Sequence, residues 1–243
     1  MQCAECRTWT RRDLLEVVTA AIALGVLATW THRLTRLGRS VVSYGSYWSQ
    51  SQGVPGGLTY VALGDSAAQG IGASSPDRGY VSLLSQRMRE LSGGEVLLIN
   101  LSASGATVRN VVDVQLPKLR ALRPDVVTVA IGGNDMAWYD AERFARAADE
   151  LIDALPAGAV VADVPLSTKA RARGLDVVLL HDAERARGSR AMLTDFAADW
   201  FHPNDRGHRV WADAFWDVLQ HDPALQRQPP SPIPPRSAPP SCR

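Results

Sequence analysis

Short runs of apolar residues, mostly aliphatic or β-branched, recur through the middle of the chain. They occupy residues 58–64, 96–101, 126–131, 160–164 and 177–180. Each run is nearly continuous in apolar residues, which is typical of parallel strands covered on both faces. Apolar residues at helical spacing lie between or after them, over residues 80–91, 108–122, 140–155 and 207–220. This alternation predicts an α/β fold, a three-layer α/β/α sandwich around a central parallel sheet of about five strands.

The connection between the last two predicted strands is unusually short. Only about ten residues, PLSTKARARG, lie between them, whereas a parallel crossover that contains a helix usually needs a dozen or more. Either the helix there is a single turn, or one of the two flanking strands is wrongly assigned.

Residues 14–30, LLEVVTAAIALGVLATW, form an apolar run near the N-terminus, with three arginines before it and three soon after it. A membrane-spanning helix needs about 20 apolar residues, and no small-residue cleavage site follows the run. The segment is therefore an uncleaved membrane anchor, an interfacial helix, or a helix packed on the domain. We expect membrane association through this uncleaved helix, with a cytoplasmic location as the alternative.

Two segments poor in periodic apolar residues bound the predicted domain. Residues 51–57 read SQGVPGG, and proline takes 8 of the 21 residues of 223–243. Proline at this density excludes a helix or a central strand, so we expect a disordered tail. The predicted organisation is an N-terminal lead over 1–57, a folded domain over 58–220 and a Pro-rich tail over 221–243.

Composition narrows the class of protein. The 243 residues are 46% hydrophobic and 21% charged, with a net charge of +1, which excludes collagen-like, fully disordered and disulfide-scaffold proteins. The predicted domain is mildly acidic, which argues against a nucleic-acid partner. Cys3 and Cys6 form a lone CxxC without the second pair that a four-ligand zinc site needs. We expect unpaired thiols at Cys3 and Cys6, with a local disulfide or half of a metal site as the alternative. The third cysteine, Cys242, lies in the C-terminal tail.

Polar residues follow the predicted strands, where α/β sheets bind ligands. They lie in four short motifs: Gly64-Asp65-Ser66, Ser104-Gly105, Gly132-Gly133-Asn134-Asp135, and Asp199-x-x-His202-Pro203 before the last helix. Taken singly, each motif is explained equally well as a turn, a tight bend or a helix cap.

Taken together, the motifs supply the groups that acyl transfer requires. A serine hydroxyl is a weak nucleophile, so it needs an adjacent base and a third group that orients the base. His202 can accept the proton of Ser66, and Asp199 can accept the other ring N–H of His202. The backbone N–H groups of Ser66 and Gly105 and the side-chain amide of Asn134 can form an oxyanion hole.

The order of these motifs resembles the SGNH hydrolases, also called the GDSL lipase/esterase family. The stretches YVALGDSAAQGIGASSPDRGYVSLL, INLSASGATV, VTVAIGGNDM and DWFHPNDRGH resemble four of its conserved blocks, within residues 58–220. The resemblance implies a flavodoxin-like fold, with Ser66, Asp199 and His202 as the triad and Ser66, Gly105 and Asn134 as the oxyanion hole. It also implies no metal and no organic cofactor. The chain departs from the family in the shortened connection between the last two strands.

The sequence therefore predicts a serine ester hydrolase that cleaves an ester or thioester through an acyl-Ser66 intermediate. The expected partner is a small-molecule or lipid ester, and we expect a monomer that contacts a membrane through residues 14–30. The alternative is a membrane-tethered binding or scaffold module with little or no turnover. A metal site of Asp199, His202, Asp205 and His208 is disfavoured because Pro203 keeps these residues off one helix face.

Overall fold

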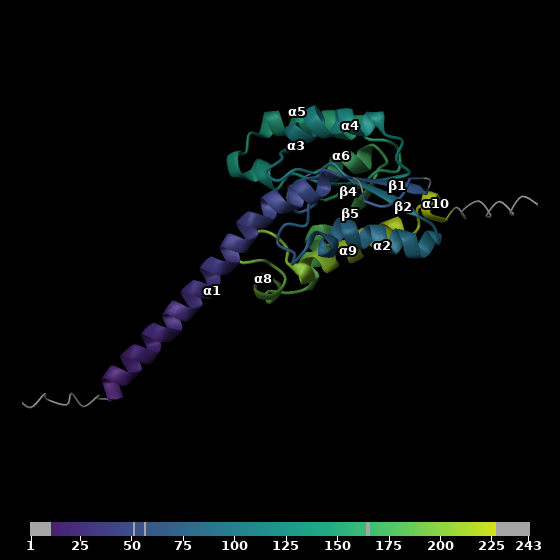
Figure 1. Ribbon diagram of the computed structural model, residues 1–243. Coiled ribbons are helices and arrows are strands. Elements are labelled where there is room, and N and C mark those ends of the chain that lie inside the picture. Colours follow the sequence, from purple (N-terminus) through teal and green to yellow (C-terminus); the bar gives the residue numbers. More distant parts are fainter. Residues whose placement is uncertain (1–10, 51, 56, 164–165, 227–243) are drawn as a thin grey trace, which may run out of the picture.

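A five-stranded parallel sheet forms the centre of the computed structural model, which describes residues 11–50, 52–55, 57–163 and 166–226 (Figure 1). The strand order is β2-β1-β3-β4-β5, and every neighbouring pair is parallel. The strands are β1 Leu58–Gly64, β2 Val96–Asn100, β3 Val126–Ala130, β4 Val160–Ala162 and β5 Asp176–Val178. This is the flavodoxin-like order, whose topological switch point lies between β1 and β3.

Helices cover both faces of the sheet and make the predicted three layers (Figure 1). One face carries α2 Tyr80–Ser92, α7 Leu180–Ala186 and α9 Asp205–Leu219. The other face carries α3 Val108–Asn110, α4 Leu116–Ala121, α5 Ala141–Ala154 and α6 Ser167–Ala172. Shorter elements are η1 Pro76–Arg78, η3 Asn134–Trp138 and α8 Ala191–Thr194. The predicted α/β/α sandwich is therefore confirmed.

The connection between β4 and β5 contains a short helix, α6, of six residues. Of the two alternatives for this short connection, the structure agrees with a very short helix, which is slightly longer than the single turn expected. The predicted fifth strand over 177–180 is wrong at its end, because the strand stops at Val178 and α7 begins at Leu180. Leu180 is buried against the same core as α9, so its apolar character reflects helix packing and not strand pairing.

The region predicted as one helix over 108–122 is interrupted by a π-helical segment, η2 Val111–Gln115. This wider turn places the buried side chain of Gln115 against the end of β1. Its amide donates to the Gly64 carbonyl at 2.8 Å and accepts from the Gly64 N–H at 3.0 Å. These two hydrogen bonds connect the end of β1 to the helical layer that contains α3, α4 and α5.

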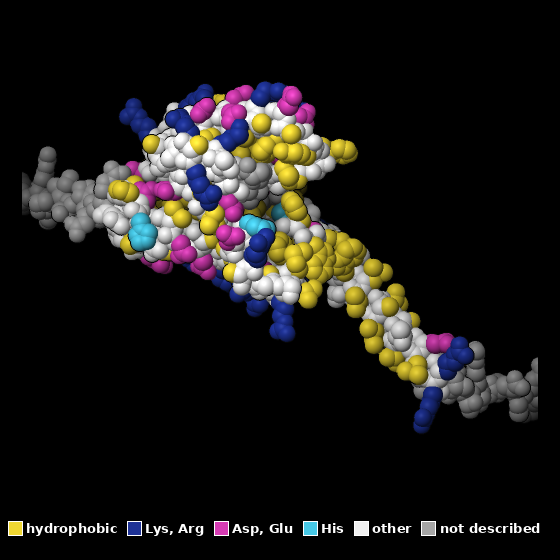
Figure 2. All heavy atoms as spheres, turned by 180° about the vertical axis from the view of Figure 1, so that it is seen from behind, with side chains coloured by type: hydrophobic (Ala, Val, Ile, Leu, Met, Phe, Trp, Pro, Cys, Tyr) yellow, Lys and Arg dark blue, Asp and Glu magenta, His cyan; other side chains and the backbone are white. Residues whose placement is uncertain are grey.

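Helix α1, Arg11–Trp48, joins the body only through its C-terminal part and projects away from it elsewhere (Figures 1 and 2). Tyr44 and Trp48 belong to the hydrophobic core. The Tyr44 hydroxyl donates to the Ala73 carbonyl at 2.9 Å, and the Trp48 indole donates to the Gln69 carbonyl at 2.9 Å. Within the described residues, no helix has an apolar stretch long enough to cross a bilayer.

The folded body also extends past its predicted C-terminal limit. Residues Pro223–Gln226 form helix α10, and Ala224 and Leu225 are buried in the core beside α2. The prediction of an unstructured tail from residue 221 is therefore wrong for this turn, because Pro223 stands at a helix start, where proline is tolerated. The remaining tail, 227–243, and Cys3, Cys6 and Cys242 lie outside the described residues.

Candidate active site

The candidate site lies at the carboxyl ends of β1, β2 and β3, beside the switch point of the sheet. Gly64, the last residue of β1, has a φ of +156°, and a Cβ there would stand 2.4 Å from the Ala130 carbonyl oxygen. Only glycine fits so close to β3. The chain then turns sharply, and Ser66 is presented at the start of the loop with 5% of its surface exposed.

Ser66, His202 and Asp199 are brought into one hydrogen-bonded row. Ser66 Oγ lies 2.8 Å from His202 Nε2, across 136 residues of sequence. His202 Nδ1 lies 2.5 Å from Asp199 Oδ2 on the opposite side of the ring. Because an ionised carboxylate can only accept, Nδ1 donates to Asp199, and Nε2 is left to accept from Ser66. The geometry is that of a nucleophile, a base and an orienting acid.

The turn that carries Asp199 and His202 is stabilised by the same carboxylate. Asp199 Oδ1 accepts from the backbone N–H groups of Phe201 and His202, both at 3.1 Å. Burial alone would raise the pKa of Asp199, but these hydrogen bonds and that of the His202 ring outweigh it and lower the pKa below its ordinary value. Asp199 is therefore held ionised.

Two backbone donors, one in the loop after β1 and one in the loop after β2, are free within the described part of the chain. Among the described residues, the N–H groups of Ser66 and Gly105 have no hydrogen-bond acceptor. Gly105 has a φ of +78°, and nothing lies within 4 Å of the place where a Cβ would stand. Glycine therefore provides the left-handed conformation and leaves room for a substrate atom next to the main chain.

Asn134 is the third expected oxyanion donor, and its amide is already engaged. Its Nδ2 donates to the Ala106 carbonyl at 2.9 Å and to Asp65 Oδ2 at a longer 3.3 Å. The first bond fixes the orientation of the amide, and the second is the weaker one. A substrate oxygen would therefore compete with Asp65 for one of the two amide hydrogens.

Asp65 is a functional neighbour that the sequence did not single out. Its carboxyl group is buried, and burial raises its pKa to about 6 despite a hydrogen bond from the Ala67 N–H. Proximity to His202 lowers that pKa, although by less than burial raises it. Asp65 therefore interacts both with Asn134, an expected oxyanion donor, and with His202, the expected base.

Three further residues position the site and were also missed. Gln115 holds Gly64 at the end of β1, and Gln69 accepts from the Ser104 hydroxyl at 2.6 Å next to Gly105. Gly72, with a φ of +96°, packs so closely that a Cβ would stand 2.9 Å from the His202 Cβ. The type of a single glutamine or glycine says little about its role in one sequence, so only the contacts reveal these roles.

The residues of the disfavoured metal site have separate tasks. Asp205 accepts from the Ser74 backbone N–H at 2.6 Å and from its hydroxyl at 2.8 Å. His208 is fully buried, where desolvation lowers its pKa to about 4, and its Nε2 donates to the Ile71 carbonyl at 3.2 Å. No group of three potential metal ligands occurs in the part of the chain that the structure describes.

Hollows adjoin the oxyanion donors. One, of about 580 Å³, is lined by residues 102–106, Gln69 and Trp48. Another, of about 180 Å³, is lined by Asn134, Trp138 and Phe144. The structure therefore has open space beside Gly105 and beside Asn134.

Comparison with known proteins agrees with this geometry. Residues 62–168 match the GDSL-like lipase/acylhydrolase family. No curated protein matches the chain.

Solved structures with a similar fold include three that cover about two thirds of the chain. TesA is 20% identical, with 67% of this chain and 98% of that chain covered and a TM-score of 0.55. A family 3 carbohydrate esterase of Clostridium thermocellum is 20% identical over 68% and 96%, with a TM-score of 0.54. A catalytic mutant of an acetylxylan esterase of Geobacillus stearothermophilus is 18% identical over 68% and 95%, also with a TM-score of 0.54. At these identities the likeness establishes the fold.

Proposed function

We propose that this chain, whose residues 62–168 match the GDSL-like lipase/acylhydrolase family, hydrolyses esters through a covalent acyl-Ser66 intermediate. The observation that carries the proposal is the row of Ser66, His202 and Asp199, with contacts of 2.8 Å and 2.5 Å on the two ring nitrogens. This arrangement activates a hydroxyl group without any further cofactor chemistry.

In the acylation step, Ser66 Oγ attacks the ester carbonyl carbon while His202 Nε2 takes the hydroxyl proton. Asp199, held ionised by its hydrogen bonds, stabilises the imidazolium through Nδ1–H. The developing oxyanion accepts from the N–H groups of Ser66 and Gly105 and from the Asn134 amide hydrogen that otherwise faces Asp65. Each such donor is worth about 3 kcal/mol in the transition state.

To complete acylation, the bond between the acyl carbon and the alcohol oxygen breaks, the imidazolium gives its proton to that oxygen, and the alcohol leaves. Water then enters beside His202, loses a proton to Nε2 and attacks the acyl carbon. Collapse of the second tetrahedral intermediate releases the acid and regenerates the Ser66 hydroxyl. Each proton that leaves a nucleophile therefore passes through one nitrogen, Nε2 of His202.

The test is hydrolysis of chromogenic esters of short and longer acyl chains by the wild type and by Ser66→Ala. We expect turnover by the wild type and a loss of at least about 10³-fold in the variant. Equal rates in the two proteins would refute the proposal. A wild type that melts cooperatively but turns over no ester or thioester would instead favour the binding or scaffold module.

A further inference from the structure

The projecting part of α1 carries apolar side chains that the domain leaves uncovered (Figure 2). Between 54% and 67% of each of these residues is exposed: Leu15, Val18, Ile22, Leu24, Val26 and Leu27. At 100° per residue they are spread around the whole helix and do not form one stripe. A helix that is apolar all round belongs in an apolar medium and not in water.

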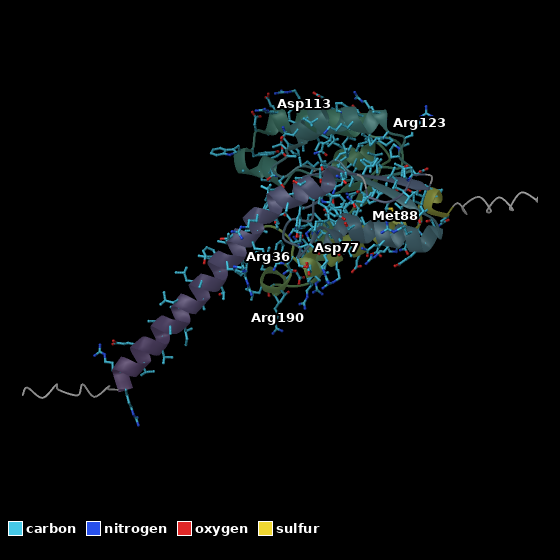
Figure 3. The ribbon with its side chains drawn as sticks, viewed as in Figure 1. Arg36, Asp77, Met88, Asp113, Arg123 and Arg190 are labelled. Carbon is cyan, nitrogen blue, oxygen red and sulfur yellow. The ribbon has the colours of Figure 1, made fainter. Side chains whose placement is uncertain are left out.

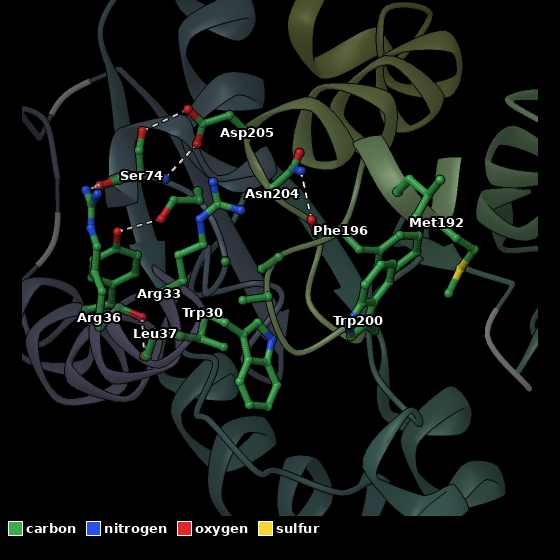
Figure 4. Close-up of a pocket in the computed structure, with 17 residues that line it drawn as sticks. Trp30, Arg33, Arg36, Leu37, Ser74, Met192, Phe196, Trp200, Asn204 and Asp205 are labelled. Atoms are coloured by element: carbon green, nitrogen blue, oxygen red, sulfur yellow. Dashed lines mark hydrogen bonds between the residues drawn. The ribbon is translucent and has the colours of Figure 1, made fainter. Parts of the chain in front are cut away.

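A groove at the base of this projecting helix continues the apolar surface onto the domain (Figure 4). Its volume is about 530 Å³. The apolar side chains that line it come from α1, from α8 and from the segment before His202: Trp30, Leu37, Met192, Leu193, Phe196 and Trp200. Leu193 is 73% exposed and Trp200 is 52% exposed, so this wall also meets the solvent.

The groove has a positively charged rim. Arg33 and Arg36 line it, and Arg33 makes no ion pair with any residue that the structure describes. The Arg36 guanidinium reaches only the Ser74 carbonyl, at 3.4 Å. The one acidic residue of the groove, Asp205, is occupied by Ser74 and lies 3.8 Å from a guanidinium nitrogen of Arg78. Two arginines therefore face the groove with their charge uncompensated.

Trp200 adds an independent observation on the same wall. Its φ of +58° makes it the non-glycine residue with a left-handed backbone in the described chain. This conformation is strained for a bulky residue, and about half of the indole is exposed to solvent. A strained backbone therefore holds the large aromatic ring of Trp200 toward the solvent, two residues before His202.

We propose that this continuous surface docks on a bilayer that contains anionic phospholipids. The phosphate groups of the lipids pair with Arg33 and Arg36, while Trp30 and Trp200 lie at the level of the headgroups and the projecting helix contacts the acyl chains. The docking does not depend on ester hydrolysis, but it places the loop of His202 at the lipid surface.

A second copy of the chain fits this surface less well. Helix pairing covers one stripe of each helix, whereas the exposed residues encircle α1. An antiparallel or parallel pair would also have to accommodate four uncompensated arginines from the two copies. A lipid surface covers every side of an apolar helix and carries the opposite charge.

The experiment is flotation of the full chain with phosphatidylcholine vesicles, with and without phosphatidylglycerol. We compare the wild type with Arg33→Glu/Arg36→Glu and with a matched control, Arg120→Glu/Arg123→Glu, which has the same spacing and charge change. Figure 3 shows Arg36 and Arg123 on different sides of the molecule. We expect preference for the anionic vesicles, a loss of about tenfold or more in the first variant, and a much smaller loss in the control.

An apolar pair of variants tests the surface without a change of charge. Leu193→Ser should weaken binding several-fold, while Leu91→Ser, at a position that is 46% exposed on α2, should leave it unchanged. Absence of binding, equal binding to neutral vesicles, or equal losses in the two charge variants would overturn the proposal. A dimer in light scattering that Leu193→Ser dissociates would overturn it in favour of a second copy.

Discussion

Replacement of Asp199 by asparagine tests how the carboxylate acts on His202. Asp199→Asn keeps an oxygen that can accept from the backbone N–H groups of Phe201 and His202, so the turn should remain intact. The other atom becomes an amide donor that faces His202 Nδ1. To accept from it, the ring must carry its proton on Nε2, which then can no longer accept the proton of Ser66.

The expected size of the effect follows from the contacts. The variant loses a 2.5 Å bond to a carboxylate, and such charge-assisted bonds contribute about 1.5–3 kcal/mol. The wrong tautomer adds to this cost. The side chains of His202 and Asp199 are only 15% and 22% exposed, so water replaces the lost acceptor incompletely. We therefore expect kcat/KM to fall by about 10²–10⁴, or about 3–5.5 kcal/mol.

The assay is steady-state hydrolysis of a chromogenic ester, with thermal unfolding measured on the same samples. Asp213→Asn is the matched control, because it removes one carboxylate from an exposed position on α9 and should change kcat/KM by less than about twofold. A drop of less than tenfold in Asp199→Asn, at an unchanged melting temperature, would refute the assigned role of Asp199.

Three other predictions concern stability and are measured by urea unfolding. Tyr80→Phe should stabilise the protein by about 1–3 kcal/mol, because the buried hydroxyl has no hydrogen-bond partner among the described residues; a destabilised variant would reveal a partner. Gly72→Ala should destabilise it by at least about 1 kcal/mol and slow hydrolysis, since its Cβ would stand 2.9 Å from the His202 Cβ; wild-type stability and rate would contradict this. Burial raises the pKa of Asp65 to about 6, so the folded state binds the proton of this carboxyl group more tightly than the unfolded state does. The stabilisation that results is fully present below pH 4 and is lost as the pH rises through 6. Relative to Asp65→Asn, the wild type should lose up to about 3 kcal/mol over this range, and parallel pH profiles would be inconsistent with that burial.

The sheet and the order of the site motifs were predictable because both leave local signals. Buried parallel strands are continuous apolar runs, and loops that follow them carry small and polar residues in a fixed order. Ser66, Gly105, Asn134 and His202 come from four separate loops, and the parallel topology brings the ends of those loops to one edge of the sheet.

Other features depend on contacts that a single sequence does not display. The apolar residues at 179–180 suit a strand or a helix equally, and only packing against α9 decides for α7. Likewise, Pro223 suggested a tail, but Ala224 and Leu225 find space in the core and form a helical turn. Tyr44 and Trp48 lie four residues apart on α1, and the sequence alone did not show that this end of the helix packs on the core.

The most direct test of the central claim is covalent labelling with a fluorophosphonate, followed by mass spectrometry of the intact chain and of its peptides. We predict one adduct per chain, located on Ser66, with ester hydrolysis lost in proportion to labelling. Asp199→Asn should label far more slowly, since His202 no longer activates the hydroxyl. Labelling at another residue, or hydrolysis that persists after Ser66 is fully modified, would contradict the account.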